Sequence, residues 1–375
     1  MDTFEKILLI VFIFLAIPLL FGIYYVTYYY QPDIKPVTIN TKPAPKEIIK
    51  EEPIIEGPVI NNLVAIETPK IVKAIYITAS SAKSQNYLKY LDNLLEETEI
   101  NTAVIDIKDS FGEAVNSDLV EKLRNKGIYT IARIAVFQDT ALAKARPDLA
   151  IHDKSLGNLS WVDPASKEVR EYNISIAKNA LSYGFDEINF DYIRFPSDGS
   201  IGNMEFPFWD KKTPMRSIIK EFFEEIREAM PDEKLSIDLF GYSAVSNDDM
   251  GIGQVLEDSF DYFDFIAPMI YPSHFKDGFI GYSNPAEYPY EVIKYSMQQA
   301  LKKYTAYYDK HQSTEELTMN KTKFRPWLQD FNMGADYTAE MVKAEIKAVA
   351  DVLGQDFNGF MLWNASNIYT VEAIK

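Results

Sequence analysis

The sequence contains no cysteine and only three histidines, His152, His274 and His311. The lack of cysteine excludes disulfides, thiolate metal sites and a cysteine nucleophile. A multi-histidine metal centre is not expected, and no acidic loop has the ligand spacing of a calcium site. We therefore expect no metal and no other cofactor. Carboxylates and aromatic rings remain as the groups that can carry chemistry.

Positive charge is also scarce, because 38 lysines and arginines face 55 aspartates and glutamates, which gives a net charge of −17. Affinity for nucleic acid comes mainly from basic side chains that contact phosphates, so a general nucleic-acid binder is excluded. Hydrophobic residues make up 47% of the chain and charged residues 25%. This composition is typical of a folded protein rather than a disordered one.

An uncharged stretch, ILLIVFIFLAIPLLFGIYYV, covers residues 7–26. Its twenty residues match the length of one bilayer-spanning helix, and the tyrosines that follow it are typical of a membrane interface. A cleaved signal peptide is the alternative, but its apolar run is usually shorter and ends at small residues. We expect residues 1–30 to be a signal anchor that crosses the cell membrane once, with the bulk of the chain on the extracytoplasmic side.

Residues 31–70 contain seven prolines and no apolar period, which is typical of an extended linker. From residue 71 onward, short β-branched runs alternate with longer amphipathic stretches. The runs cover 72–78, 101–109, 128–136, 187–195, 235–243, 263–272, 324–331 and 358–366. Eight such units predict a (β/α)₈ TIM barrel over residues 71–375, with a helix after each strand. The rival, a doubly wound open sheet, would usually show a glycine-rich turn after its first strand, and this sequence has none there.

The amphipathic stretches include 85–98, 117–126, 165–183, 213–230, 286–309 and 337–353. One helix start is well marked, because Asp163 can act as N-cap and Pro164 can occupy the first helical position. The long segment from 138 to 161 is expected to be a loop that forms a lid or a wall of the site.

Barrel enzymes carry their chemistry at the carboxyl ends of the strands, so polar residues late in each run are candidates. Glu187 begins its run and is therefore interpreted as structural. By period-two alternation, Asp106 shares a face with Lys108, and Asn189 shares one with Asp191. Mutual neutralisation of such charges inside the barrel is one interpretation. A purely structural barrel, however, would fill these layers with aliphatic residues, which favours a functional site.

Aspartates beside tryptophan and tyrosine at strand ends indicate a carbohydrate site, because sugar rings stack on aromatic faces and their hydroxyls need polar partners. Cleavage of a glycosidic bond requires two carboxyl groups, of which one donates a proton and the other is ionised. The expected partner is therefore a polysaccharide or an oligosaccharide.

The segment GFDEINFDYIRFPSDG (184–199) resembles a bacterial glycosyl hydrolase domain family, a barrel family long classed as being of unknown function. The resemblance continues through VIDIKDSFG (104–112), FIAPMIYPSHF (265–275), RPWLQDF (325–331) and FMLWNASNIY (360–369). It implies a barrel with glycoside hydrolase activity. A more distant similarity to chitinase-type glycosidases places Ile193 where their catalytic glutamate would stand, so their acetamido-assisted mechanism does not carry over. The similarity does extend to MIY (269–271) and Trp363, which match the walls of the sugar subsite.

We assign the ionised role, as nucleophile or stabiliser of positive charge, to Asp191. Asp238 is the first candidate for the general acid, with Asp330 and Asp106 behind it. The upper rim of the barrel is expected to gather Asp191, Asp238 and Asp330 around one aromatic-walled cleft. The residues expected to bind substrate are Lys108, Arg133, Asn189, Arg194, Tyr271, His274, Trp327, Gln329, Trp363 and Asn364.

The sequence thus predicts a membrane-anchored glycoside hydrolase that acts on an extracellular or cell-wall polysaccharide. A non-catalytic glycan-binding barrel at the cell surface is the alternative, and the missing glutamate at position 193 favours it. A protein-interaction scaffold is a third interpretation, in which the acidic surface only confers solubility. The clustering of polar residues at the strand ends argues against this last interpretation.

Overall fold

The computed structural model describes residues 66–155, 157–311 and 322–375, which belong to one compact unit spanning 56–375. The predicted membrane span at 7–26 and most of the predicted linker lie outside these residues. Within the described ranges, no helix has both the length and the apolar character needed to cross a bilayer.

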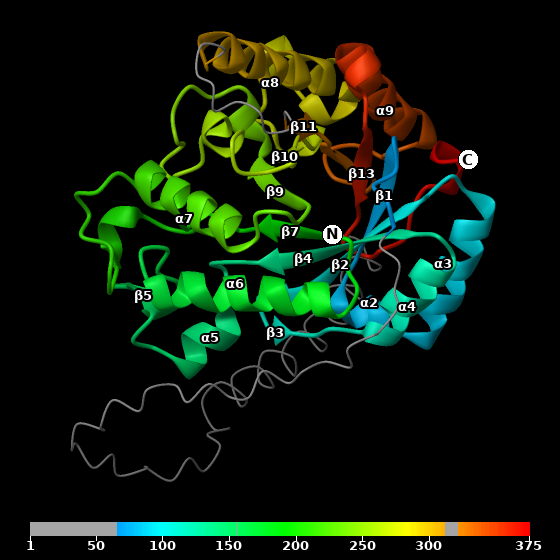
Figure 1. The fold of residues 1–375 in the computed structure, drawn as a ribbon. Helices are drawn as coiled ribbons and strands as arrows, with labels where there is room; N and C mark the ends of the chain where they lie inside the picture. Colours follow the sequence, from blue (N-terminus) through cyan, green and yellow to red (C-terminus); the bar gives the residue numbers. More distant parts are fainter. Residues whose placement is uncertain (1–65, 156, 312–321) are drawn as a thin grey trace, which may run out of the picture. The chain divides into compact units, whose positions relative to one another are not determined.

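Eight parallel strands form a closed barrel (Figure 1). They are β1 (Val72–Ile77), β2 (Thr102–Asp109), β4 (Tyr129–Ala135), β7 (Glu187–Asp191), β9 (Leu235–Phe240), β10 (Phe265–Met269), β12 (Trp327–Gln329) and β13 (Gly359–Trp363). The barrel closes because β1 pairs in parallel with both β2 and β13. A short strand, β11 (Lys323–Phe324), pairs with β10 just before β12. Each run expected from the sequence contains one barrel strand, so the predicted barrel architecture is confirmed.

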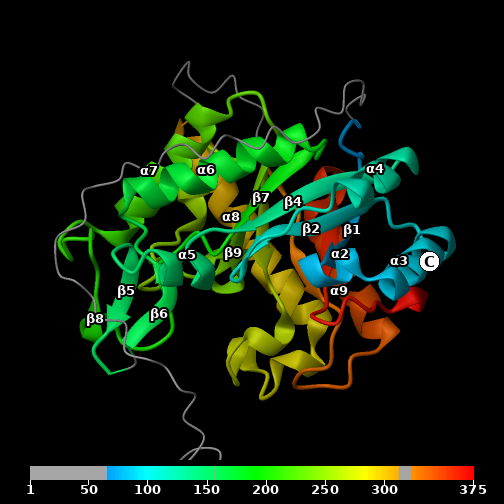
Figure 2. The same cartoon turned by 90° about the horizontal axis from the view of Figure 1, so that it is seen from below.

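Helices surround the barrel, as Figures 1 and 2 show. They are α2 (Ala79–Lys83), α3 (Gln85–Glu97), α4 (Ser117–Asn125), α6 (Lys167–Ser182), α7 (Met215–Ala229), α8 (Pro289–His311) and α9 (Ala339–Leu353). The expectation of a helix after every strand is wrong at two places in the described chain. Between β9 and β10 only short 3₁₀ turns occur, at Gly241–Ala244 and Leu256–Ser259, and β13 is followed only by the turn Val371–Ala373.

The predicted cap of α6 is also wrong. The N-cap is Ser166, whose hydroxyl accepts a hydrogen bond from the backbone N–H of Val169. The Asp163 carboxylate instead accepts hydrogen bonds from the backbone N–H groups of Phe208 (2.7 Å) and Trp209 (2.9 Å). Asp163 therefore links the segment before α6 to the segment before α7. Its carboxylate forms these long-range hydrogen bonds instead of capping α6.

The predicted loop at 138–161 contains regular structure. Helix α5 (Thr140–Ala145) is followed by β5 (Ala150–Asp153) and β6 (Gly157–Val162), which form a small antiparallel sheet with β8 (Met204–Glu205). Figure 2 shows this sheet beside the barrel. A further short strand, β3 (Gly112–Glu113), folds back against the end of β2. The insertion places Trp161, at the end of β6, next to the segment that follows β7.

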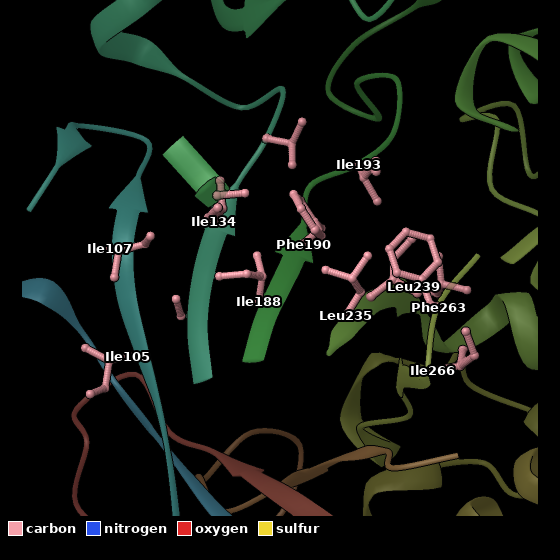
Figure 3. Packing of buried hydrophobic residues seen from close by; sticks show 14 of the residues in the cluster. Ile105, Ile107, Ile134, Ile188, Phe190, Ile193, Leu235, Leu239, Phe263 and Ile266 are labelled. Carbon is pink, nitrogen blue, oxygen red and sulfur yellow. The ribbon is translucent and has the colours of Figure 1, made fainter. Parts of the chain in front are cut away.

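Alternation along the strands divides the apolar side chains between two cores. Outward residues such as Ile105, Ile188 and Phe190 pack beneath the helices in the larger core (Figure 3). Inward residues such as Val104 and Met361 form a smaller cluster inside the barrel. The inner cluster is small because charged and polar side chains occupy much of the barrel interior.

A buried ion pair occupies the amino-terminal end of the barrel. Glu187 and Arg325 pair directly, and both side chains are fully buried. The hydroxyl of Tyr129 donates a second hydrogen bond to Glu187 at 3.1 Å, and the Arg325 guanidinium lies 4.1 Å from the ring centre of Phe265. The structural interpretation of Glu187 is confirmed by this position, which lies at the opposite end of β7 from Asp191.

Replacing Glu187 with Gln should lower the free energy of unfolding by about 3–5 kcal/mol, because it leaves the Arg325 charge buried without its acid. Denaturant unfolding of the purified chain measures the loss. A matched control is Glu171→Gln, which removes one partner of an exposed pair with Lys167 and should leave the midpoint unchanged. Equal midpoints for the Glu187 variant and the wild type would contradict a stabilising role for this pair.

Candidate active site

A cavity of about 960 Å³ opens at the carboxyl end of the barrel, and all eight barrel strands or the segments directly after them contribute to its lining. Nine of the candidate residues lie on its wall: Asp106, Arg133, Asp191, Arg194, Asp238, Tyr271, His274, Trp327 and Trp363. Polar residues at the ends of the strands therefore do converge on one shared site. The remaining candidate residues lie outside this cavity.

Arg133 lies at the centre of the polar floor. Its Nη1 donates to Asp106 at 2.5 Å, its Nη2 donates to Asp191, and its Nε lies 3.7 Å from Asp238. These four residues come from β2, β4, β7 and β9, which are consecutive in the barrel. Tyr76 on β1 donates its hydroxyl hydrogen to the second oxygen of Asp106. One cation is therefore shared among three carboxyl groups.

Asp238 is almost completely buried, with 1% of its surface exposed. Its Oδ1 accepts hydrogen bonds from Trp327 Nε1 at 2.7 Å and from Asn189 Nδ2 at 2.9 Å. Its Oδ2 has no hydrogen-bond partner among the described residues. Because both donors are on one oxygen, a proton on this carboxyl group belongs on Oδ2.

Burial raises the pKa of Asp238 to about 8, and the negative charge of Asp191 adds to the increase. The charge of Arg133 and the hydrogen bonds from Asn189 and Trp327 oppose it. Near neutral pH, Asp238 is therefore largely a protonated acid. This is the protonation state that a general acid needs before the reaction starts.

Asp191 ends β7 in a different environment. Its Oδ2 accepts from Arg133, and its Oδ1 accepts from the backbone N–H of Tyr192 at 2.6 Å. Tyr192 has a φ of +51°, a left-handed conformation that is uncommon for a residue with a bulky side chain. The turn thus presents a backbone donor to Asp191, which accepts a hydrogen bond on each of its two oxygens.

Aromatic rings form one wall of the cavity. Trp363 lies near Tyr271 and Tyr76, with ring centres 5.8 and 6.3 Å away. The ring of His274 packs against Tyr271 at 5.2 Å, and partial burial lowers the pKa of His274, which keeps its imidazole neutral near pH 7. Within the described chain, no hydrogen bond is formed by the buried Tyr271 hydroxyl. This wall has the apolar faces and free polar group that a sugar ring requires.

Lys108 does not reach the cavity, and its predicted place beside Asp106 is wrong. The β2–β4 pairing slips between Asp106 and Lys108, a β-bulge that breaks the alternation. The Lys108 ammonium instead forms a fully buried pair with Asp139 at 2.9 Å and donates to the backbone carbonyls of Ala135, the last residue of β4, and Val136. Lys108 therefore holds the end of β4 and the N-cap of α5 in place, and it does not line the cavity.

Asp330 stands apart from Asp191 and Asp238, which corrects the expectation that the three share a cleft. Its carboxylate accepts from the Thr370 backbone N–H at 2.8 Å and from the Thr370 hydroxyl at 2.6 Å. It lines a separate hollow of about 360 Å³. The strand β12 ends at Gln329, so Asp330 already turns away from the barrel axis.

Three amides were also expected to contact substrate and lie elsewhere. Gln329 accepts from the Ser273 backbone N–H and donates to the Phe331 carbonyl. Asn364 donates to the carbonyl of Asp330. Asn189 lies beneath the cavity floor, where it supports Asp238. All three amides therefore position neighbouring groups, and none lines the cavity.

The sequence did not predict several aromatic residues of the cavity lining, among them Tyr76, nor Trp161, which lies beside the cavity residue Arg194. Tyr76 holds Asp106, and alternation from Val72 could have placed it on the inner face of β1. Trp161 packs against Arg194 at 4.7 Å, although it comes from the inserted sheet rather than from a strand end. The search for polar residues at strand ends could not identify Trp161, because this residue is apolar and does not end a barrel strand.

Metal binding has little support in the described parts of the chain, where no group of three or more histidine or acidic side chains is arranged to hold an ion. Asp106, Asp191 and Asp238 converge, but a guanidinium occupies the point at which they meet.

Replacing Asp238 with Asn should make stability less dependent on pH. The folded-state pKa of Asp238 is raised, so the folded wild type retains a proton that the unfolded chain releases near pH 4. Wild-type stability should therefore fall as the pH rises from about 4 to about 8, whereas a neutral amide pays no such penalty. Thermal midpoints of both proteins are measured across this range. The midpoint of the variant should rise relative to that of the wild type as the pH increases. A constant difference would contradict the raised pKa.

A family model described as "Putative glycosyl hydrolase domain" matches residues 113–369, and no curated protein matches the sequence significantly. A hypothetical protein from Ruminiclostridium thermocellum is 30% identical; the match covers 48% of this chain and 98% of that one, with a TM-score of 0.40. The PgaB (BpsB) glycoside hydrolase domain from Bordetella bronchiseptica has a TM-score of 0.55 at 11% identity, covering 79% of this chain and 95% of that one.

An α-galactosidase from Thermus thermophilus has a TM-score of 0.50 at 14% identity, covering 81% of this chain and 60% of the other. At such low identities these two structures show a shared barrel fold. The family match extends over more than half of the chain and includes the strands that carry Arg133, Asp191 and Asp238. The chain therefore belongs to the glycosyl hydrolase domain family.

Proposed function

We propose that this protein hydrolyses O-glycosidic bonds in a polysaccharide, with Asp238 as the general acid and Asp191 as the ionised carboxylate. The observation that carries the proposal is the opposite environment of two acids that share one arginine. Family membership and the folds of the PgaB domain and the α-galactosidase support the reaction class.

In the first step, Asp238 donates its proton to the glycosidic oxygen as the bond from this oxygen to the anomeric carbon breaks. Asp191 stabilises the positive charge that develops on the sugar, or attacks the anomeric carbon from the opposite face. The ionised Asp238 then accepts a proton from the water molecule that completes hydrolysis, which restores both groups. Arg133 remains charged throughout and limits the repulsion between the two carboxylates.

The shape of the cavity supports an extended substrate. Its volume of about 960 Å³ lies at the upper end of the range for ligand pockets, which leaves room for a larger ligand. Phe111, at the turn that follows β2, lines the mouth and is 82% exposed. An exposed ring at the mouth, in addition to Trp363 inside, offers stacking positions for more than one sugar unit.

A glycan-binding barrel without catalysis is the second candidate. The observation that favours it is Ile193, which occupies the place of the chitinase-type catalytic glutamate and is completely buried. In this case the paired aspartates would only bind hydroxyl groups. The same cavity serves both functions, so turnover has to be measured directly.

Replacing Asp238 with Asn should lower kcat by about 10²–10⁴-fold, the usual contribution of a general acid. Replacing Asp191 with Asn should lower it by at least about 10³-fold. The wild-type rate should fall as the pH rises through about 8, because Asp238 then loses its proton. Release of reducing ends from a polysaccharide panel measures all three effects.

Asp330→Asn is the matched control, since Asp330 lies outside the cavity and should affect stability but not turnover. Full activity of the Asp191 variant would remove this residue from the mechanism. Binding of glycans by the wild type without any reducing-end release would instead establish the glycan-binding function.

We also propose that residues 7–26 anchor the protein in the cell membrane, so that the barrel meets extracellular or cell-wall polysaccharide. The support is the sequence pattern described above, because this segment lies outside the described residues. Deleting residues 7–26 should move the protein from the carbonate-washed membrane pellet to the supernatant. Deletion of residues 31–50 should leave it in the pellet, and a full-length chain found in the supernatant would contradict anchoring.

A further inference from the structure

Arg194 has a different environment from Arg133, although both line the cavity. It follows β7 in the sequence IRFP and is only 5% exposed. Three aromatic rings surround its guanidinium, with centres 4.3 Å (Phe240), 4.7 Å (Trp161) and 5.4 Å (Tyr192) from the central carbon. These rings come from β9, from the inserted sheet and from the left-handed turn, and they hold the cation in one place.

The hydrogen bonds of Arg194 account for only part of its donors. Its Nη1 donates to the Phe195 carbonyl at 3.0 Å and to the Ser197 hydroxyl at 3.3 Å. No aspartate or glutamate within 66–155, 157–311 or 322–375 lies at ion-pair distance from it, and its Nε and Nη2 have no acceptor there. A nearly buried arginine without a directly paired acid is costly, because its charge has lost water and the acids that act on it, Asp191 and Asp198, do so only from a distance.

The cavity has no other cation to offer. Among its lining residues, Arg133 and Arg194 are the two arginines, no lysine is present, and the His274 imidazole is neutral near pH 7. Arg133 is already shared among Asp106, Asp191 and Asp238. Burial lowers the pKa of Arg194, yet a guanidinium remains protonated in proteins at all ordinary pH values. Arg194 is thus a permanent charge without a direct ion-pair partner, because Asp191 and Asp198, which raise its pKa, lie beyond ion-pair distance.

We infer that Arg194 binds a carboxylate on the substrate, so that the natural glycan carries an acidic sugar. This inference rests on the proposed function for the presence of a sugar in the cavity. Arginine is suited to the role because two donors on one edge can bind both oxygens of a planar carboxylate. The rings of Trp161 and Phe240 hold the guanidinium and leave its Nε–Nη2 edge without a partner.

Matched pairs of sugars test this inference without requiring cleavage. D-glucuronate is compared with D-glucose, and N-acetylmuramic acid with N-acetylglucosamine, by calorimetric titration of the purified chain. In D-glucuronate the carboxylate takes the place of the hydroxymethyl group of glucose. In N-acetylmuramic acid it belongs to a lactyl ether substituent. At least one acidic sugar should bind about tenfold more tightly than its neutral partner, since a charge-assisted bidentate pair is among the stronger polar contacts.

Arg194→Gln should reduce that preference to about onefold while leaving affinity for the neutral sugar unchanged, which shows that the cavity remains intact. Arg194→Lys, which keeps the charge but loses the fork, should retain part of the preference. Equal binding of both members in both pairs, no binding of any of the four sugars, or a preference that survives in the Gln variant would overturn the inference. Reducing-end release is measured separately, so a binding preference without turnover would refute only the hydrolase proposal.

Discussion

The guanidinium of Arg133 controls the charge of the site, because Asp106, Asp191 and Asp238 all lie against it. Three buried carboxylates could not remain ionised around a single positive charge. The surroundings decide which of them holds a proton. Asp106 and Asp191 accept hydrogen bonds on both oxygens, whereas Oδ2 of Asp238 accepts none in the described chain. Burial raises the pKa of both Asp106 and Asp238, so a single cation serves three carboxyl groups with different hydrogen-bond environments.

Charged side chains have different roles at the two ends of the barrel interior. At the amino-terminal end, Glu187 and Arg325 neutralise one another, and neither lines the large cavity at the other end of the barrel. At the carboxyl end, three acids surround one arginine, and Asp238 retains a proton near neutral pH. Aromatic side chains form one wall of the cavity there. The same β7 strand carries both Glu187 and Asp191, so structural and chemical roles are separated along its length.

Periodicity predicted the barrel because each strand is buried on both faces, which produces recognisable apolar runs. It also placed Asp191 and Asp238 correctly, since both lie within regular pairing. It failed at Lys108, where a bulge reverses the alternation, and at Asp330, where the strand has already ended. It could not find Trp161, whose contact with Arg194 depends on how an insertion packs. Local sequence patterns thus predict the strands and the side of each strand on which a residue lies. Bulges and long-range packing depend on the three-dimensional structure.

The position of β1 has a consequence for biosynthesis. This strand begins at residue 72, yet one of its two neighbours, β13, begins only at residue 359. While the chain is being made, both β1 and β12 therefore present an unpaired edge until nearly all of it has emerged. Tyr369 and Asn367 then hydrogen-bond to the carbonyl of Tyr76, the residue that holds Asp106. A nascent or prematurely terminated chain would thus lack support at the polar floor of the cavity and expose edges that chaperones and proteases recognise.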